Sequence, residues 1–106
     1  MAWFYLLLAG SLEIVATTLF RYTEGLSRIV PTASFLVAGI ASFYFLNRSL
    51  SGIPLGTAYA VWTGIGAAGT AIIGMAAYGE TTTALRILFL AGLIVCIVGL
   101  KFVAEH

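Results

Sequence analysis

The most informative feature of this sequence is how little charge it carries. Asp, Glu, Lys and Arg make up 8% of its 106 residues, and 61% are hydrophobic. Soluble domains average about 25% charged and roughly 45–50% apolar residues. A small soluble domain exposes much of its area and needs polar side chains to cover its core. Because that cover is missing, we expect lipid to surround most of the chain.

Cysteine, metal ligands and clustered basic residues are also scarce, and each scarcity excludes a class of function. The single cysteine, Cys96, excludes an intrachain disulfide and a cysteine-based metal cluster. A net charge of +1 without basic clusters excludes a nucleic-acid partner. The sequence has no phosphate-binding glycine loop, metal-ligand spacing or nucleophile–base pair. We therefore expect no enzyme activity, no metal and no cofactor.

Four long apolar runs dominate the chain, and a bilayer core asks for about 20 apolar residues per helix. We expect membrane spans at residues 3–20, 32–49, 55–78 and 85–103 within one domain, residues 1–106. The polar segments 21–28, 51–54 and 79–83 form the loops, and threonines in the last can cap the following helix. The predicted fold is an all-α membrane protein of four transmembrane helices, with both termini on one side.

Basic residues are nearly balanced between the two sides of this arrangement. Arg21, Arg28 and Arg86 lie on the side of the first and third loops, and Arg48 and Lys101 on the other. Orientation follows the excess of Lys and Arg, so this small difference permits insertion either way. Four helices enclose little volume, and a pathway for a solute calls for two copies. A dual-topology, antiparallel homodimer would satisfy both observations.

Glu13, near the middle of the first run, is the principal functional candidate. A charge at bilayer depth costs at least roughly 2.5–3.5 kcal/mol, and no basic residue occurs at comparable depth to offset it. Because burial disfavours the charged form, the carboxyl can hold a proton and release it when a cation arrives. The alternative is a protonated acid that only hydrogen-bonds between helices. On the same face, Ala9, Gly10, Ala16 and Thr17 either leave space for a ligand or permit close helix packing.

Aromatic residues of the third run can complete a cation site. Tyr59 and Trp62 lie one turn apart with Thr63 beside them, and an aromatic face attracts a cation by roughly 0.5–2 kcal/mol. The alternative is an interfacial aromatic belt. Residues near the span ends fit that belt well: Trp3, Tyr5, Tyr22 and Tyr78. In the second run, Ser42 either polarises the site or bonds its own helix backbone.

Small residues of the third and fourth runs suggest two further roles. Gly64, Gly66 and Gly69 permit a helix bend that would open the subunit to either side of the membrane. A packing seam explains the same glycines equally well. The fourth run has no polar group at depth, and its small residues suggest a dimer-packing surface. These are Gly92, Cys96 and Gly99.

Several motifs together resemble the small multidrug resistance family of bacterial transporters. They are Glu13 followed by Thr17 and Thr18, segment 23–28 (TEGLSR) before Pro31, and segment 53–66 (IPLGTAYAVWTGIG). The likeness covers essentially the whole chain. It implies a multi-pass protein of the bacterial inner membrane, an antiparallel homodimer that exchanges protons for organic cations. It also implies that the Glu13 pair binds protons and substrate in competition, and that Tyr59, Trp62 and Ser42 are site residues.

Two branches of that family differ in substrate. Guanidinium exporters usually carry tryptophan three residues after the glutamate, where this chain has Ala16, and segment 16–18 resembles the quaternary-ammonium branch. Segments 62–67, 83–86 and 99–101 resemble the guanidinium branch instead. Ala16 removes bulk and an indole N–H beside the carboxylate, which favours larger hydrophobic cations. We therefore expect a proton-coupled exporter of quaternary ammonium compounds. The alternatives are a guanidinium exporter and a non-transporting accessory subunit.

Overall fold

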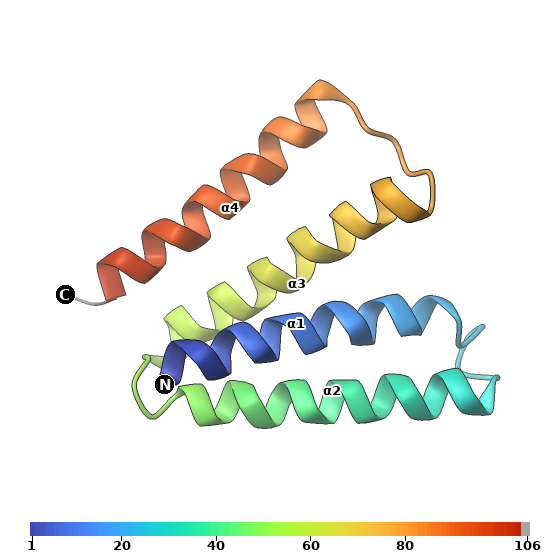
Figure 1. The fold of residues 1–106 in the computed structure, drawn as a ribbon, viewed down its shortest axis with the longest axis horizontal. Helices are drawn as coiled ribbons and strands as arrows, with labels where there is room; N and C mark the ends of the chain where they lie inside the picture. Colours follow the sequence, from blue (N-terminus) through green and yellow to red (C-terminus); the bar gives the residue numbers. More distant parts are fainter. Residues whose placement is uncertain (105–106) are drawn as a thin grey trace.

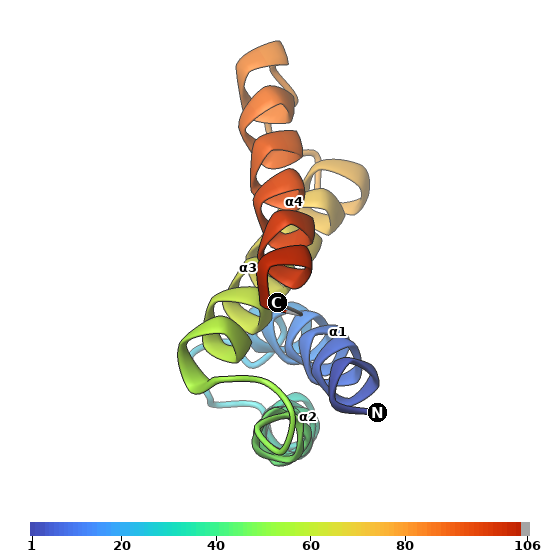
Figure 2. The same ribbon diagram turned by 90° about the vertical axis from the view of Figure 1, so that its left-hand side faces the viewer.

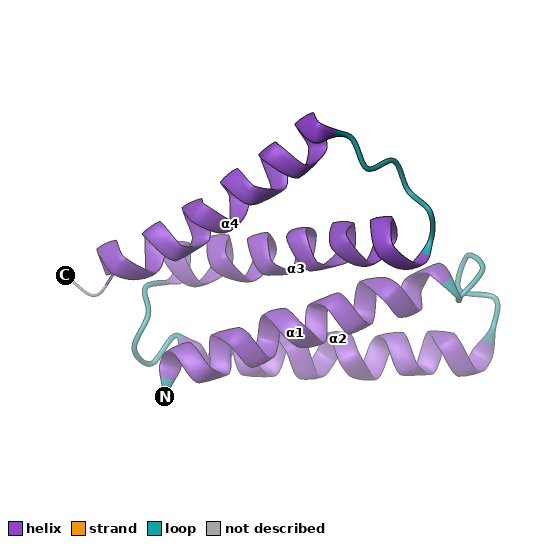
Figure 3. Ribbon diagram, turned by 45° about the horizontal axis from the view of Figure 1, so that its top comes forward, coloured by secondary structure: helices purple, strands orange, loops and turns teal. Residues whose placement is uncertain are grey.

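The computed structural model describes residues 1–104 and is built from four helices (Figure 1). They are α1 (Ala2–Arg21), α2 (Ile29–Ser49), α3 (Leu55–Ala77) and α4 (Ala84–Ala104). Each is long and apolar enough to cross a membrane. Short loops join them, and the described part of the chain contains no strand (Figure 3). The predicted all-α class is confirmed, and the start of α1 lies at the same end of the molecule as the end of α4 (Figure 1).

Helix α2 starts earlier than the sequence pattern predicts. It begins at Ile29 instead of residue 32 and includes Pro31 in its first turn. Proline is tolerated there because the first backbone N–H groups of a helix have no intrahelical acceptor. The next N–H, that of Thr32, donates to the carbonyl of Arg28 across 3.1 Å. The loop threonine Thr83 caps α4 as expected, because its hydroxyl accepts the backbone N–H of Arg86 across 3.1 Å.

Helix α1 packs between α2 and α3, while α4 lies along α3 and diverges from the other helices (Figures 1 and 2). Small side chains bring α1 close to its neighbours. Ala9, Gly10 and Ala16 are buried, and a Cβ built on Gly10 would lie 2.7 Å from Cγ2 of Ile65. These three residues therefore serve helix packing in this subunit.

Basic and aromatic side chains meet at both ends of the bundle. At the end with the first and third loops, Arg21 lies 4.0 Å above the ring of Tyr78, whose hydroxyl hydrogen-bonds that of Tyr22. At the other end, the ammonium of Lys101 lies 5.4 Å from the ring centre of Trp3. These placements fit the aromatic belt found at membrane–water interfaces.

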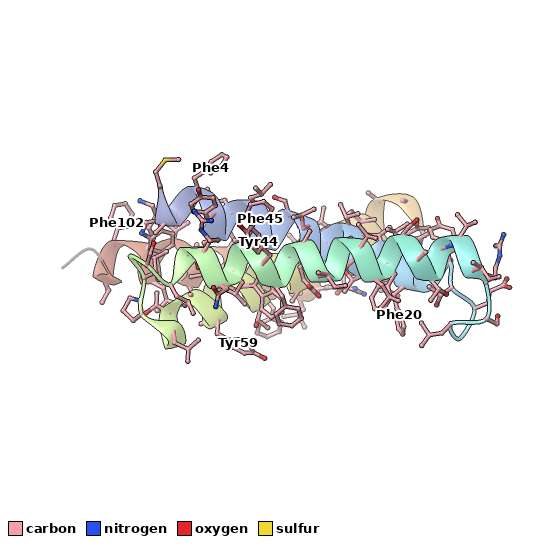
Figure 4. The ribbon with its side chains drawn as sticks, turned by 90° about the horizontal axis from the view of Figure 1, so that it is seen from below. Phe4, Phe20, Tyr44, Phe45, Tyr59 and Phe102 are labelled. Atoms are coloured by element: carbon pink, nitrogen blue, oxygen red, sulfur yellow. The ribbon has the colours of Figure 1, made fainter. Side chains whose placement is uncertain are left out.

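The outer surface of the bundle is strongly apolar. Phe4 and Tyr59 project from opposite sides of the bundle (Figure 4) and are 58% and 55% exposed. Helix α4 contributes no buried residue over its apolar stretch, and Phe89 is 71% exposed. So large an exposed apolar surface is unfavourable in water and is typical of a surface that contacts lipid or another subunit.

Candidate functional site

A cavity of about 470 Å³ lies beside α1 and α3, and Glu13 is part of its wall. The residues that line it come from one side of each of these helices and from the loop before α4. From α1 they are Glu13 and Thr17; from α3 they are Tyr59, Trp62, Thr63, Gly66, Ala67, Thr70 and Ala71; from the loop there is Glu80. The structure thus gathers Glu13, Thr17, Tyr59, Trp62 and Thr63 of the predicted site around one cavity.

The carboxylate arm of Glu13 fits because Gly66 has no side chain. A Cβ built on Gly66 would lie 2.8 Å from Cγ of Glu13, which is shorter than real contacts of this kind. Glu13 is half-buried. Within residues 1–104, no Lys or Arg forms an ion pair with it. A positive charge that could offset the cost of this carboxylate must therefore come from outside this described part of the subunit.

Ser42 joins three helices and stands behind the cavity wall. The indole N–H of Trp62 donates to the Ser42 hydroxyl across 2.9 Å. That hydroxyl donates to the backbone carbonyl of Ala9 across 2.6 Å. Ser42 is fully buried and bonds the backbone of α1, not that of its own helix. The hydroxyl thus holds the indole of Trp62 in place, and it also lies close enough to the Glu13 carboxylate to interact with it.

The aromatic rings beside the cavity form a short cluster around Trp62. The ring centre of Tyr59 lies 5.6 Å from that of Trp62. The ring centre of Phe43, on α2, lies 5.1 Å from that of Trp62. Within residues 1–104, no hydrogen bond joins Tyr59 to Glu13. Tyr59 instead offers its ring and its exposed hydroxyl to the open side of the cavity.

Thr70 also lines the cavity, although it was not predicted as a site residue from the sequence. Its hydroxyl lies 2.7 Å from that of Thr17. The Thr17 hydroxyl donates its proton to the backbone carbonyl of Glu13 across 2.8 Å. The hydrogen bond between the two threonines is therefore donated by Thr70. Thr63, Gly66 and Thr70 follow the spacing of one helix face. Extending the face of Tyr59 and Trp62 by two further turns would have found it.

Glu80 is a further polar residue of the cavity that was not predicted as a site residue from the sequence. It lies in the loop between α3 and α4, and its Oε1 accepts a hydrogen bond from Nη2 of Arg86 across 2.9 Å. Loop residues follow no helical period, so no pattern in the sequence connects Glu80 with Glu13. The chain reversal after α3 brings it to the cavity.

The three glycines of α3 that were predicted to permit a bend pack against other segments. Helix α3 continues from Leu55 to Ala77. A Cβ built on Gly64 would lie 2.8 Å from Cδ1 of Ile97, and one on Gly69 would collide with Ile14. Together with Gly66, these positions favour the packing-seam interpretation. The predicted bend stays a prediction.

The small residues of α4 lie on an open surface. Gly92, Cys96 and Gly99 are all exposed, and a Cβ built on either glycine would meet no atom within 4 Å. This surface is free of contacts inside the described subunit. Its predicted role in dimer packing remains a prediction.

Ala16 does not lie where the sequence argument placed it. The residue is 2% exposed and is absent from the cavity wall. A residue three positions after Glu13 is rotated by about 300° around the helix axis, which is short of a full turn. A residue four positions after Glu13 is rotated by about 40° past a full turn, so it lies closer to the direction of Glu13. Thr17 therefore reaches the cavity with Glu13, and Ala16 turns into the helix contact.

Comparison with known proteins places the chain among transporters. A family model described as "Small Multidrug Resistance protein" matches residues 1–101. A protein of Yersinia pestis and one of Proteus vulgaris are each 46% identical over 101 residues, which cover 95% of this chain and 97% of the relative. A protein of Escherichia coli K12 is 44% identical over 101 residues, covering 95% and 96%. All three relatives carry the name "Guanidinium exporter".

Proposed function

The chain belongs to the Small Multidrug Resistance protein family, and from this premise we propose that it exports guanidinium in exchange for protons. Family membership makes it a transporter and not an enzyme. With its four apolar helices, it is a multi-pass protein of the bacterial inner membrane. The substrate and the roles of individual residues are what the proposal adds.

The preference for quaternary ammonium compounds is not supported, and guanidinium takes its place. The similar relatives are named as guanidinium exporters. The earlier preference depended on extra space at Ala16 beside the carboxylate. Ala16 is buried in a helix contact, so it adds no space to the cavity of this subunit. The segments around Trp62 and Arg86 that resemble the guanidinium branch are the better indication of the substrate.

The observation that carries the proposal is the Glu13 carboxylate in the cavity wall, with which no Lys or Arg of residues 1–104 forms an ion pair. Guanidinium is a planar cation whose N–H groups match the two oxygens of a carboxylate. The rings of Tyr59 and Trp62 line the same cavity and offer cation–π attraction. A proton or a guanidinium ion can neutralise Glu13, but not both at once. Mutually exclusive binding of this kind couples export of the cation to proton entry.

We propose that the working unit is an antiparallel homodimer. One subunit leaves the cavity open, since Tyr59 in its wall is 55% exposed. A second copy would close this side and place a second Glu13 near the first. The face of α4 that carries Gly92 and Gly99 is available for subunit packing.

Uptake of labelled guanidinium into vesicles that contain the purified protein tests this function. We expect a pH gradient to drive uptake, and excess guanidinium to compete better than excess tetraethylammonium. Glu13→Gln should abolish the pH-driven uptake while the protein still assembles. Glu24→Gln is the matched control, because Glu24 is an exposed loop carboxylate outside the cavity.

Other outcomes would point elsewhere. Stronger competition by tetraethylammonium would favour the quaternary-ammonium function. Absence of any cation transport by the purified protein would favour an accessory subunit. Uptake driven by a pH gradient in the Glu13→Gln variant would contradict the proposed role of Glu13.

A further inference from the structure

Glu80 is a second acidic side chain on the cavity that contains Glu13. It also borders a smaller cavity of about 110 Å³ near the loops, which shares Thr17 and Thr70 with the larger one. The two cavities thus meet at the Thr17–Thr70 hydrogen bond, with Glu80 on the side of the loops. A cation that moves along this route passes Arg21, which also lines the smaller cavity, and encounters the Glu80 carboxylate near the loops and the Glu13 carboxylate inside the helical bundle.

The carboxylate of Glu80 is seated firmly at the end of α3. The backbone N–H of Glu80 donates to the carbonyl of Gly74 across 3.1 Å. A Cβ built on Gly74 would lie 2.5 Å from the carboxyl carbon of Glu80. Gly79 adopts a φ of +67°, which allows the chain to turn back in this way. The absence of side chains at Gly74 and Gly79 therefore lets the carboxylate face the cavity.

The group that pairs with the Glu80 carboxylate in this structure is itself a guanidinium, that of Arg86. Nη2 of Arg86 lies 2.9 Å from Oε1 of Glu80, and the two side chains are 35% and 47% exposed. Ion pairs of such exposure are weak, so a competing cation can displace Arg86. The cargo proposed above has the same planar, N–H-donating shape as the end of the Arg86 side chain.

We propose that Glu80 is a transfer site for guanidinium at the loop end of the cavity. The cargo replaces Arg86 on the Glu80 carboxylate as it passes between water and Glu13. Arg86 returns to Glu80 when the cargo leaves, so the carboxylate is never left without a counter-charge. This role rests on the proposed guanidinium function and adds a residue to it.

The test compares Glu80→Gln with Arg86→Gln in guanidinium uptake by vesicles. Glu80→Gln removes the transfer site and should raise the half-saturation concentration by about two- to fivefold, the range of an exposed ion pair. Arg86→Gln removes the competitor and should lower it by a similar factor. If the ion pair only holds the loop in place, both substitutions break the same contact and shift the half-saturation concentration in the same direction.

A double variant separates a specific site from surface charge. Glu80→Gln with Arg86→Gln restores the net charge of the loop. A transfer site predicts that the double variant behaves like Glu80→Gln, whereas a surface-charge effect predicts wild-type behaviour. Glu24→Gln and Arg28→Gln are controls on the first loop, whose residues do not line the cavity. Circular dichroism and size-exclusion chromatography establish that each variant folds.

The outcomes distinguish this inference from the function on which it rests. Opposite shifts for the two single variants, with the double variant resembling Glu80→Gln, would support it. Shifts in the same direction, no shifts, or a double variant equal to wild type would overturn it, while wild-type uptake and its loss in Glu13→Gln would leave the proposed function intact. A wild-type protein that does not transport guanidinium would overturn both.

Discussion

The side chain of Glu13 crosses Gly66 so closely that a Cβ on the glycine would lie 2.8 Å from Cγ of the glutamate. The two residues belong to α1 and α3, so this contact sets the distance between the helices at the level of the carboxylate. The position of the acidic group in its cavity thus depends on a residue that has no functional group of its own.

Gly66→Ala should displace the Glu13 side chain and impair guanidinium transport. We expect the added methyl group to cost about 1–3 kcal/mol in strain, partly offset by the better helix propensity of alanine. Transport in vesicles and stability in detergent would measure the two effects. Gly56→Ala is the matched control on α3, because a Cβ there meets no atom within 4 Å. Equal transport by both variants would contradict the spatial argument.

Ser42→Ala should destabilise the protein by leaving the indole N–H of Trp62 without its acceptor. A buried donor without a partner costs about 1–3 kcal/mol. Ser11→Ala removes an exposed hydroxyl that bonds only the Leu7 carbonyl of its own helix, so we expect a change within about 0.5 kcal/mol. Thermal unfolding in detergent compares them. The interpretation fails if the Ser42 variant is as stable as the Ser11 variant.

Gly92→Leu should weaken self-association without disturbing the fold of a single subunit. The position is open in the subunit, so a larger side chain meets an obstacle there only when another copy packs against α4. Energy transfer between labelled subunits in vesicles would report association, and circular dichroism would report helix content. Gly39→Leu on α2 is a control, because a Cβ on that glycine also meets no atom within 4 Å. Unchanged association of the Gly92 variant would place the interface elsewhere.

Hydrophobic run length and helix spacing were sufficient to predict most of the fold. The apolar runs gave the four helices, and Glu13 stood out because a charge inside such a run is costly. Tyr59, Trp62 and Thr17 reach the cavity because spacings of three and four residues place side chains on one face. Patterns of this kind are local, and local geometry carries them directly into the structure.

Contacts between segments were beyond such patterns. The partners of Ser42 come from two other helices, and Glu80 reaches the cavity through a chain reversal. The role of Ala16 was misplaced because positions three and four residues from Glu13 were treated as one face, although only Thr17 turns toward the cavity. Which side of a narrow helix face meets a cavity depends on how the helices are rotated against one another.

Binding of guanidinium to the purified protein as a function of pH tests the central claim most directly. If protons and guanidinium compete for Glu13, the apparent Kd for guanidinium rises as the pH falls, by up to about tenfold per pH unit for each proton displaced. The Glu13→Gln variant should show no measurable guanidinium binding at any pH. A Kd that stays constant with pH in the wild-type protein would contradict exchange at a shared carboxylate.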